Sequence, residues 1–185
     1  MSIGRILIAA ALAATAVPAV AAVTVIGSTS ARMCFEAADA ALLPSRDSLV
    51  RCNEALSGEN LSDYDTVATY VNRGILKLRL GESDSAIADF NTALARDPNQ
   101  PEAYLNKGIA MLRKPDGWTQ AMPLFDEAIA RKTRRPALAY YGRGVANELG
   151  GNVRQAYYDY REASRIEPKW RDPRLELTRF TVSPH

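Results

Sequence analysis

A pattern that recurs about every 34 residues across 67–170 constrains this chain more than any other feature. Gly74, Gly108 and Gly144 each follow a tyrosine by four residues. An alanine and an aromatic residue then recur in the same order after each glycine. A repeat of this length is one supersecondary unit that cannot bury its apolar face alone, so neighbouring units have to stack.

The spacing inside each unit predicts two helices. In the first unit, Tyr70, Gly74 and Leu78 share one helical face, and Ala86 and Phe90 share a face of the next segment. A glycine within a helix costs roughly 1 kcal/mol relative to alanine. We therefore expect Gly74 to be a contact point where the two helices approach closely, with Phe90 filling the space beside it.

This pattern resembles the tetratricopeptide repeat (TPR), over units 67–100, 101–135 and 137–170. The chain departs from the family in having Arg73, Lys107 and Arg143 where an apolar residue usually precedes the small one. The resemblance implies an all-α fold, an α-solenoid of stacked antiparallel helical hairpins. Three repeat units, preceded by the capping sequence at Ser62, make up a predicted domain over 63–170.

Two further segments flank the repeats. Residues 31–57 resemble a degenerate hairpin placed before the first unit, and residues 171–182 are predicted to form a capping helix. The chain has two cysteines, Cys34 and Cys52, which we expect to form a disulfide across the first hairpin. Two reduced thiols and an intermolecular bridge are the alternatives.

The N-terminus has the pattern of a secretory signal over residues 1–21. No charged residue occurs between Ile6 and Ile26, and Ala19-Val20-Ala21 has small residues at the positions that a signal peptidase requires. We therefore expect an exported protein, periplasmic or secreted. Because the uncharged run is also long enough to cross a bilayer, the alternative is an uncleaved inner-membrane anchor with the repeats facing the periplasm.

The sequence contains no recognisable catalytic constellation. The single histidine is the last residue, His185, so no pairing of histidine with a nucleophile and no histidine–cysteine metal site is expected. Residues 23–100 have 7 Lys+Arg against 11 Asp+Glu, and residues 101–185 have 15 against 10. This imbalance is too mild to favour nucleic acid. We expect neither enzymatic activity, nor a cofactor, nor a metal.

The TPR resemblance implies a concave groove lined by the first helix of each unit. The positions that would face a ligand are Val71, Asn72, Ile75, Arg79, Leu105, Asn106, Ile109, Arg113, Tyr141 and Val145. Asparagine both donates and accepts, so Asn72 and Asn106 could pair with the backbone of an extended peptide. Alternatively, the two asparagines only bond to the neighbouring helix.

These features together predict a non-catalytic protein–protein interaction adaptor of the bacterial cell envelope, which binds a protein or peptide segment in the TPR groove. A membrane-anchored structural component and a catalytically silent subunit of an envelope enzyme assembly are the alternatives. The sequence does not indicate the oligomeric state.

Overall fold

The computed structural model describes residues 2–3, 21–27, 29–40, 44–180 and 182–183. Those residues contain two short antiparallel strands, β1 (Ser2–Ile3) and β2 (Val182–Ser183). They also contain nine helices: α1 (Thr29–Asp39), α2 (Arg46–Gly58), α3 (Asp63–Arg79), α4 (Ser83–Arg96), α5 (Pro101–Leu112), α6 (Trp118–Ala130), α7 (Pro136–Leu149), α8 (Val153–Ile166) and α9 (Arg171–Leu177).

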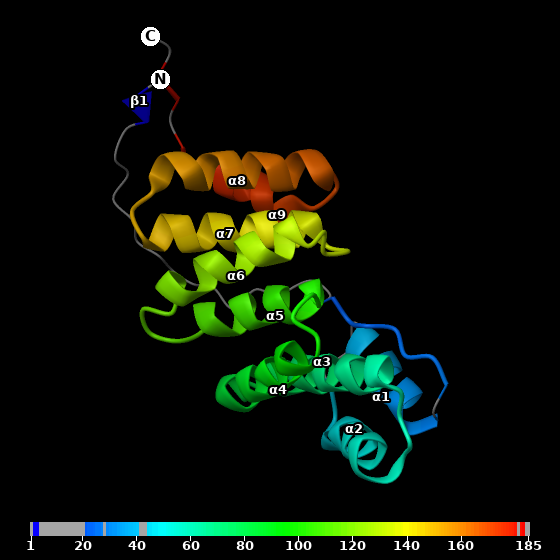
Figure 1. Cartoon of the computed structure of the whole chain (residues 1–185). Helices are drawn as coiled ribbons and strands as arrows, with labels where there is room; N and C mark the ends of the chain where they lie inside the picture. The colour runs from blue at the N-terminus through cyan, green and yellow to red at the C-terminus, as the bar shows by residue number, and fades with distance from the viewer. Residues whose placement is uncertain (1, 4–20, 28, 41–43, 181, 184–185) are drawn as a thin grey trace.

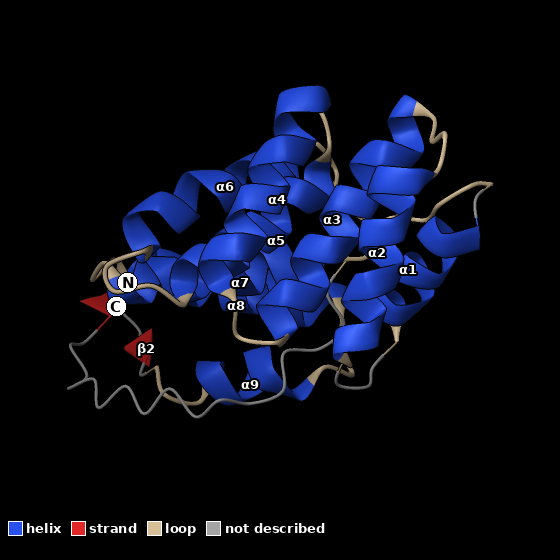
Figure 2. Ribbon diagram, turned by 90° about the horizontal axis from the view of Figure 1, so that it is seen from below, coloured by secondary structure: helices blue, strands red, loops and turns tan. Residues whose placement is uncertain are grey.

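The helices form a stack of antiparallel hairpins, so the predicted fold class is confirmed. Figure 1 shows the hairpins following one another from α1 and α2 at one end to α7 and α8 at the other. The short helix α9 packs against α8, and Figure 2 shows that helices make up nearly all of the described chain. Because each hairpin mainly contacts its neighbours, the apolar core runs along the stack.

The repeated glycines are the points where the two helices of a hairpin meet. A Cβ atom added at Gly74 would lie 2.5 Å from the ring of Phe90, which is fully buried. Gly144 has the same relation to Tyr160, at 2.7 Å. The structure thus confirms that Gly74 is a close contact, because an aromatic ring from the second helix occupies the space of its missing side chain.

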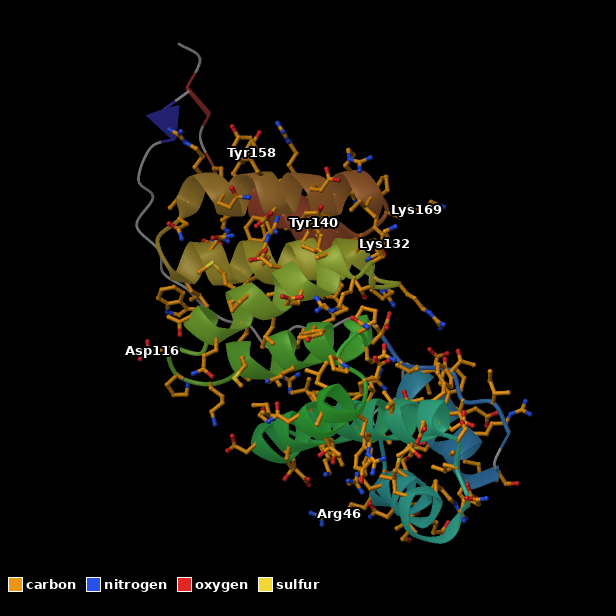
Figure 3. The ribbon with its side chains drawn as sticks, in the orientation of Figure 1. Arg46, Asp116, Lys132, Tyr140, Tyr158 and Lys169 are labelled. Atoms are coloured by element: carbon orange, nitrogen blue, oxygen red, sulfur yellow. A yellow bond between two sulfur atoms is a disulfide. The ribbon has the colours of Figure 1, made fainter. Side chains whose placement is uncertain are left out.

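The turns inside the hairpins require a left-handed residue. Gly81 and Gly151 have φ values of 85° and 78°, which glycine adopts at no steric cost. In the second unit, Asp116 occupies the turn between α5 and α6 at φ 53°. Lys132, in the turn after α6, is also left-handed, at φ 59°. Figure 3 shows these two side chains projecting from opposite sides of the stack.

Ion pairs with buried carboxylates account for two of the basic residues that depart from the TPR pattern. The Arg73 guanidinium donates to both carboxylate oxygens of Asp89, at 2.9 and 2.7 Å, and Arg143 binds Asp159 in the same way. The second unit has Leu124 in the corresponding position, and burial lowers the pKa of Lys107 there. These bidentate pairs join α3 to α4 and α7 to α8.

The first hairpin contains the predicted disulfide, which joins Cys34 of α1 to Cys52 of α2. Both cysteines are fully buried, and α1 and α2 both contact α3. A terminal hairpin has a neighbour on one side only, so a covalent link supplies stability that packing cannot.

The predicted signal segment, residues 1–21, lies mostly outside the described residues. Within the described part of the chain, no helix is long and apolar enough to cross a membrane.

The glycine–aromatic contact can be tested by replacing Gly74 with alanine. Alanine is the better helix former, but its methyl group would push into the buried ring of Phe90. We expect a net loss of about 1–2 kcal/mol in the free energy of unfolding, because overpacking a core typically costs 1–3 kcal/mol. Chemical denaturation monitored by circular dichroism measures this change.

Gly58 supplies the matched control, because it is exposed at the end of α2 and an added Cβ would meet nothing within 4 Å. Gly58→Ala should leave stability unchanged or raise it by up to about 1 kcal/mol. A Gly74→Ala protein as stable as Gly58→Ala would contradict the proposed role of the contact.

Candidate peptide-binding surface

An extended segment of the chain lies against α3 and α5, in the predicted groove. We call residues 21–27 the groove segment; they precede α1 and have no helical structure. Figure 1 shows the end of this segment as the blue chain leading into α1. Val23 and Val25 are buried and Thr24 between them is exposed, as in a strand with one face covered.

Asn72 holds the centre of the groove segment by its backbone. The side-chain oxygen of Asn72 accepts from the Val23 N–H at 2.8 Å, and its nitrogen donates to the Val23 carbonyl at 2.7 Å. In an extended chain the N–H and C=O of one residue point to the same side, so the single side-chain amide of Asn72 can bind both. Asn72 is fully buried, which makes these hydrogen bonds costly to leave unmade.

Asn106 makes a partial version of the same contact on α5. Its side-chain nitrogen donates to the Ala21 carbonyl at 3.3 Å and to the Glu102 carbonyl at 2.8 Å. Ala21 lies two residues before Val23 and therefore presents its backbone to the same side. The side-chain oxygen of Asn106 is buried and has no hydrogen-bond partner among the described residues.

Apolar side chains surround the two asparagines. Four of the predicted ligand-facing residues are buried in the same apolar cluster as the groove segment: Val71, Ile75, Leu105 and Ile109. We call these four residues, together with Asn72 and Asn106, the α3–α5 surface. It combines apolar contact with amide groups that recognise a backbone rather than a particular side chain.

Sequence reasoning missed two of the residues that contact the groove segment, and missed the segment itself. Asp65, in the first turn of α3, accepts from the Ile26 N–H at 2.8 Å, and Arg134 donates to the Thr24 hydroxyl at 3.3 Å. The only available signal was the alternating β-branched run Val23-Thr24-Val25, which is typical of extended structure. It lies at the end of the uncharged run between Ile6 and Ile26, which predicts a signal or an anchor.

Arg79 and Arg113, which are also predicted to face a ligand, bind backbone carbonyls of the chain itself. Arg79 donates to the carbonyl of Ala40, just after α1, at 2.8 Å, and Arg113 donates to the carbonyl of Leu78 in α3. Burial lowers the pKa of both guanidinium groups. The recurring arginines therefore bind carbonyls at the end of the preceding first helix, which links successive hairpins.

Tyr141 and Val145 in the third unit do not join the α3–α5 surface. The Tyr141 ring packs against Trp170, with the ring centres 4.9 Å apart, and its hydroxyl donates to Glu176 of α9 at 3.4 Å. Burial, reinforced by the Glu176 carboxylate, raises the pKa of Tyr141. The C-terminal helix thus covers Tyr141, while Val145 is half-buried on α7.

The α3–α5 surface offers hydrogen bonds and apolar contact, and none of its six side chains is titratable. Among the described residues, no group of three or more His, Cys, Asp or Glu side chains could hold a metal ion.

Comparisons with known proteins agree with this architecture. A family model described as TPR repeat matches residues 66–114. A comparison with curated protein sequences gave no significant match. The family match and the solved structures below support a TPR protein.

Three solved structures with a similar fold are informative, and all are below 25% identity, so the likeness concerns the fold alone. The first TPR domain of human RPAP3 is 24% identical, with a TM-score of 0.56 over 60% of this chain and 87% of that one. The first TPR of Spaghetti (RPAP3), bound to an HSP90 peptide, has the same identity and coverage and a TM-score of 0.57. MamA from Desulfovibrio magneticus RS-1 is 21% identical, with a TM-score of 0.61 over 71% of each chain.

The hydrogen bonds between Asn72 and the groove segment can be tested by replacing Asn72 with alanine. This leaves the N–H and C=O of Val23 without their partners, so the segment should open more often. We expect the Val23 and Ile26 amides to exchange with solvent at least tenfold faster, while the amides of α3–α8 keep their protection. Hydrogen exchange followed by NMR measures both.

Asn106→Ala is the graded control, because Asn106 makes one hydrogen bond to the segment where Asn72 makes two. Its effect on the Val23 amide should be smaller than that of Asn72→Ala. Unchanged exchange in the Asn72 variant would show that the asparagine does not hold the segment.

Proposed function

We propose that this protein is a non-catalytic TPR adaptor of the bacterial cell envelope that binds an extended peptide segment on the α3–α5 surface. One observation carries the proposal: Asn72, buried among apolar residues, pairs with both backbone groups of one residue of an extended chain. A surface that holds one extended segment by its backbone has the donors, acceptors and apolar contacts to hold another. The TPR neighbour solved with a bound peptide is consistent with this use of the fold.

The location in the envelope is supported by two features of the chain. The first is the signal-like pattern of residues 1–21, and the second is the disulfide between Cys34 and Cys52, a bond that persists in oxidising compartments. Cleavage after Ala21 would leave Ala22 as the first residue, one position before the residue that Asn72 binds. The Asn72 contacts would then be retained, and the Asn106 contact with Ala21 would be lost.

Peptide recognition can be tested by display selection. Random peptides are selected on the purified protein and their affinities are then measured against an Asn72→Ala/Asn106→Ala variant. We expect selected peptides to bind the double variant more weakly, because the net contribution of about 1 kcal/mol from each hydrogen bond to the peptide backbone is lost.

Asn99→Ala is the matched control, since Asn99 is an exposed asparagine in the turn between α4 and α5. It should bind the selected peptides with unchanged affinity. Peptides that bind the wild type and the double variant equally well would place recognition elsewhere on the protein.

Export can be tested by mass spectrometry of the protein isolated from a bacterial envelope fraction. We expect a mature chain that begins near Ala22. An intact N-terminus that fractionates with the inner membrane would instead support the anchored alternative.

A further inference from the structure

The groove segment occupies the α3–α5 surface in the way an external peptide would. Its backbone is held at three points: by Asn106 at Ala21, by Asn72 at Val23 and by Asp65 at Ile26. Four of its side chains are buried: Ala21, Ala22, Val23 and Val25. A second peptide could use these contacts only if the segment left them.

The segment is attached at the edge of the surface that it covers. Two residues separate Ile26 from the start of α1 at Thr29, and the disulfide ties α1 to α2. Both helices pack on α3, so the attachment point is fixed relative to Asn72. A short link of this kind gives the segment a high effective concentration and returns it to the surface after each opening.

The fit of the segment is incomplete at Asn106. The side-chain oxygen of Asn106 is an acceptor without a partner among the described residues, on a side chain that is fully buried and whose nitrogen already binds Ala21. Asn72 shows what a complete contact requires, namely the N–H and C=O of one residue. A peptide that also presents an N–H to Asn106 would make a hydrogen bond that the segment does not make.

The side chains of the segment indicate which peptides fit. The buried residues are alanine and valine, and the residue between Val23 and Val25 faces solvent. The surface therefore suits an extended segment with small or β-branched apolar residues, a solvent-facing residue in the place of Thr24 and no charge on the buried side.

We propose that residues 22–26, which remain after cleavage at Ala21, are a built-in competitor that blocks the α3–α5 surface until an extended peptide with small or β-branched apolar residues displaces them. This inference rests on the proposed function, because it takes the α3–α5 surface as the peptide site. The apparent affinity for a peptide is then the intrinsic affinity multiplied by the fraction of molecules whose surface is uncovered. A change that frees the segment raises this fraction and strengthens peptide binding in proportion.

The test uses the full chain as isolated and a labelled peptide, acetyl-AAVTVIG, which copies residues 21–27. The acetyl group keeps the nitrogen of the first alanine an uncharged amide, as it is in the chain. Val23→Pro removes the N–H that Asn72 accepts, and so weakens the segment without altering the α3–α5 surface. Thr24→Pro is the matched control, because it places the same ring at an exposed residue and removes only the exposed hydrogen bond from Arg134.

Fluorescence anisotropy measures peptide affinity, and hydrogen exchange at the Ile26 amide measures opening. We expect Val23→Pro to speed Ile26 exchange and to bind the peptide about tenfold more tightly than the wild type and Thr24→Pro, which corresponds to a closed population of about 90%. Adding Asn72→Ala to Val23→Pro should abolish the gain.

The other outcomes separate this inference from the proposed function. If Val23→Pro opens the segment but binds the peptide no more tightly than the wild type, the segment is not a competitor and the peptide site stands. If the opened variant binds no peptide at all, the proposed function fails too. Unchanged Ile26 exchange in Val23→Pro would show that the segment is a fixed part of the fold. A wild-type dimer that Val23→Pro converts to a monomer would make the occupant the segment of a second copy.

Discussion

The structure depends on the close approach of paired helices at glycine. Gly74, Gly108 and Gly144 each leave space for an aromatic ring from the second helix of the hairpin, namely Phe90, Phe125 and Tyr160. This contact fixes how the two helices of each unit pack against each other. It therefore also determines which residues of the first helix face away from the second helix. The helical cost of each glycine is offset by packing that a larger side chain would block.

The α3–α5 surface follows from that arrangement. Asn72 lies two positions before Gly74, and Asn106 lies two positions before Gly108, so the repeat places both amides equivalently on successive first helices. Their burial among apolar residues makes hydrogen bonds to a backbone favourable relative to leaving the amides unpaired. The groove segment meets this requirement fully at Asn72 and only in part at Asn106, where the side-chain oxygen has no partner among the described residues.

The sequence predicted the repeats well because their constraints are local and periodic. Glycine, alanine and aromatic positions recur at helical spacing, so the hairpins and the Gly74–Phe90 contact could be inferred from residue types alone. The partners of Arg79 and Arg113 could not be inferred in this way. Each arginine binds a backbone carbonyl, and every residue has one, so the residue types do not identify the partner. The pairing of Asn72 with Val23 also joins positions 49 residues apart, and Val23 stood in a run that resembled the end of a signal.

Asn72 can be observed directly in contact with the groove segment by NMR of the isotope-labelled protein. A nuclear Overhauser effect between the Asn72 side-chain amide protons and the backbone of Val23 or Thr24 is expected. It should be accompanied by order parameters near the rigid-backbone value of about 0.85 for Val23 to Val25. Absence of that effect, with order parameters below about 0.6 in these residues, would contradict the claim that the α3–α5 surface holds an extended chain by its backbone.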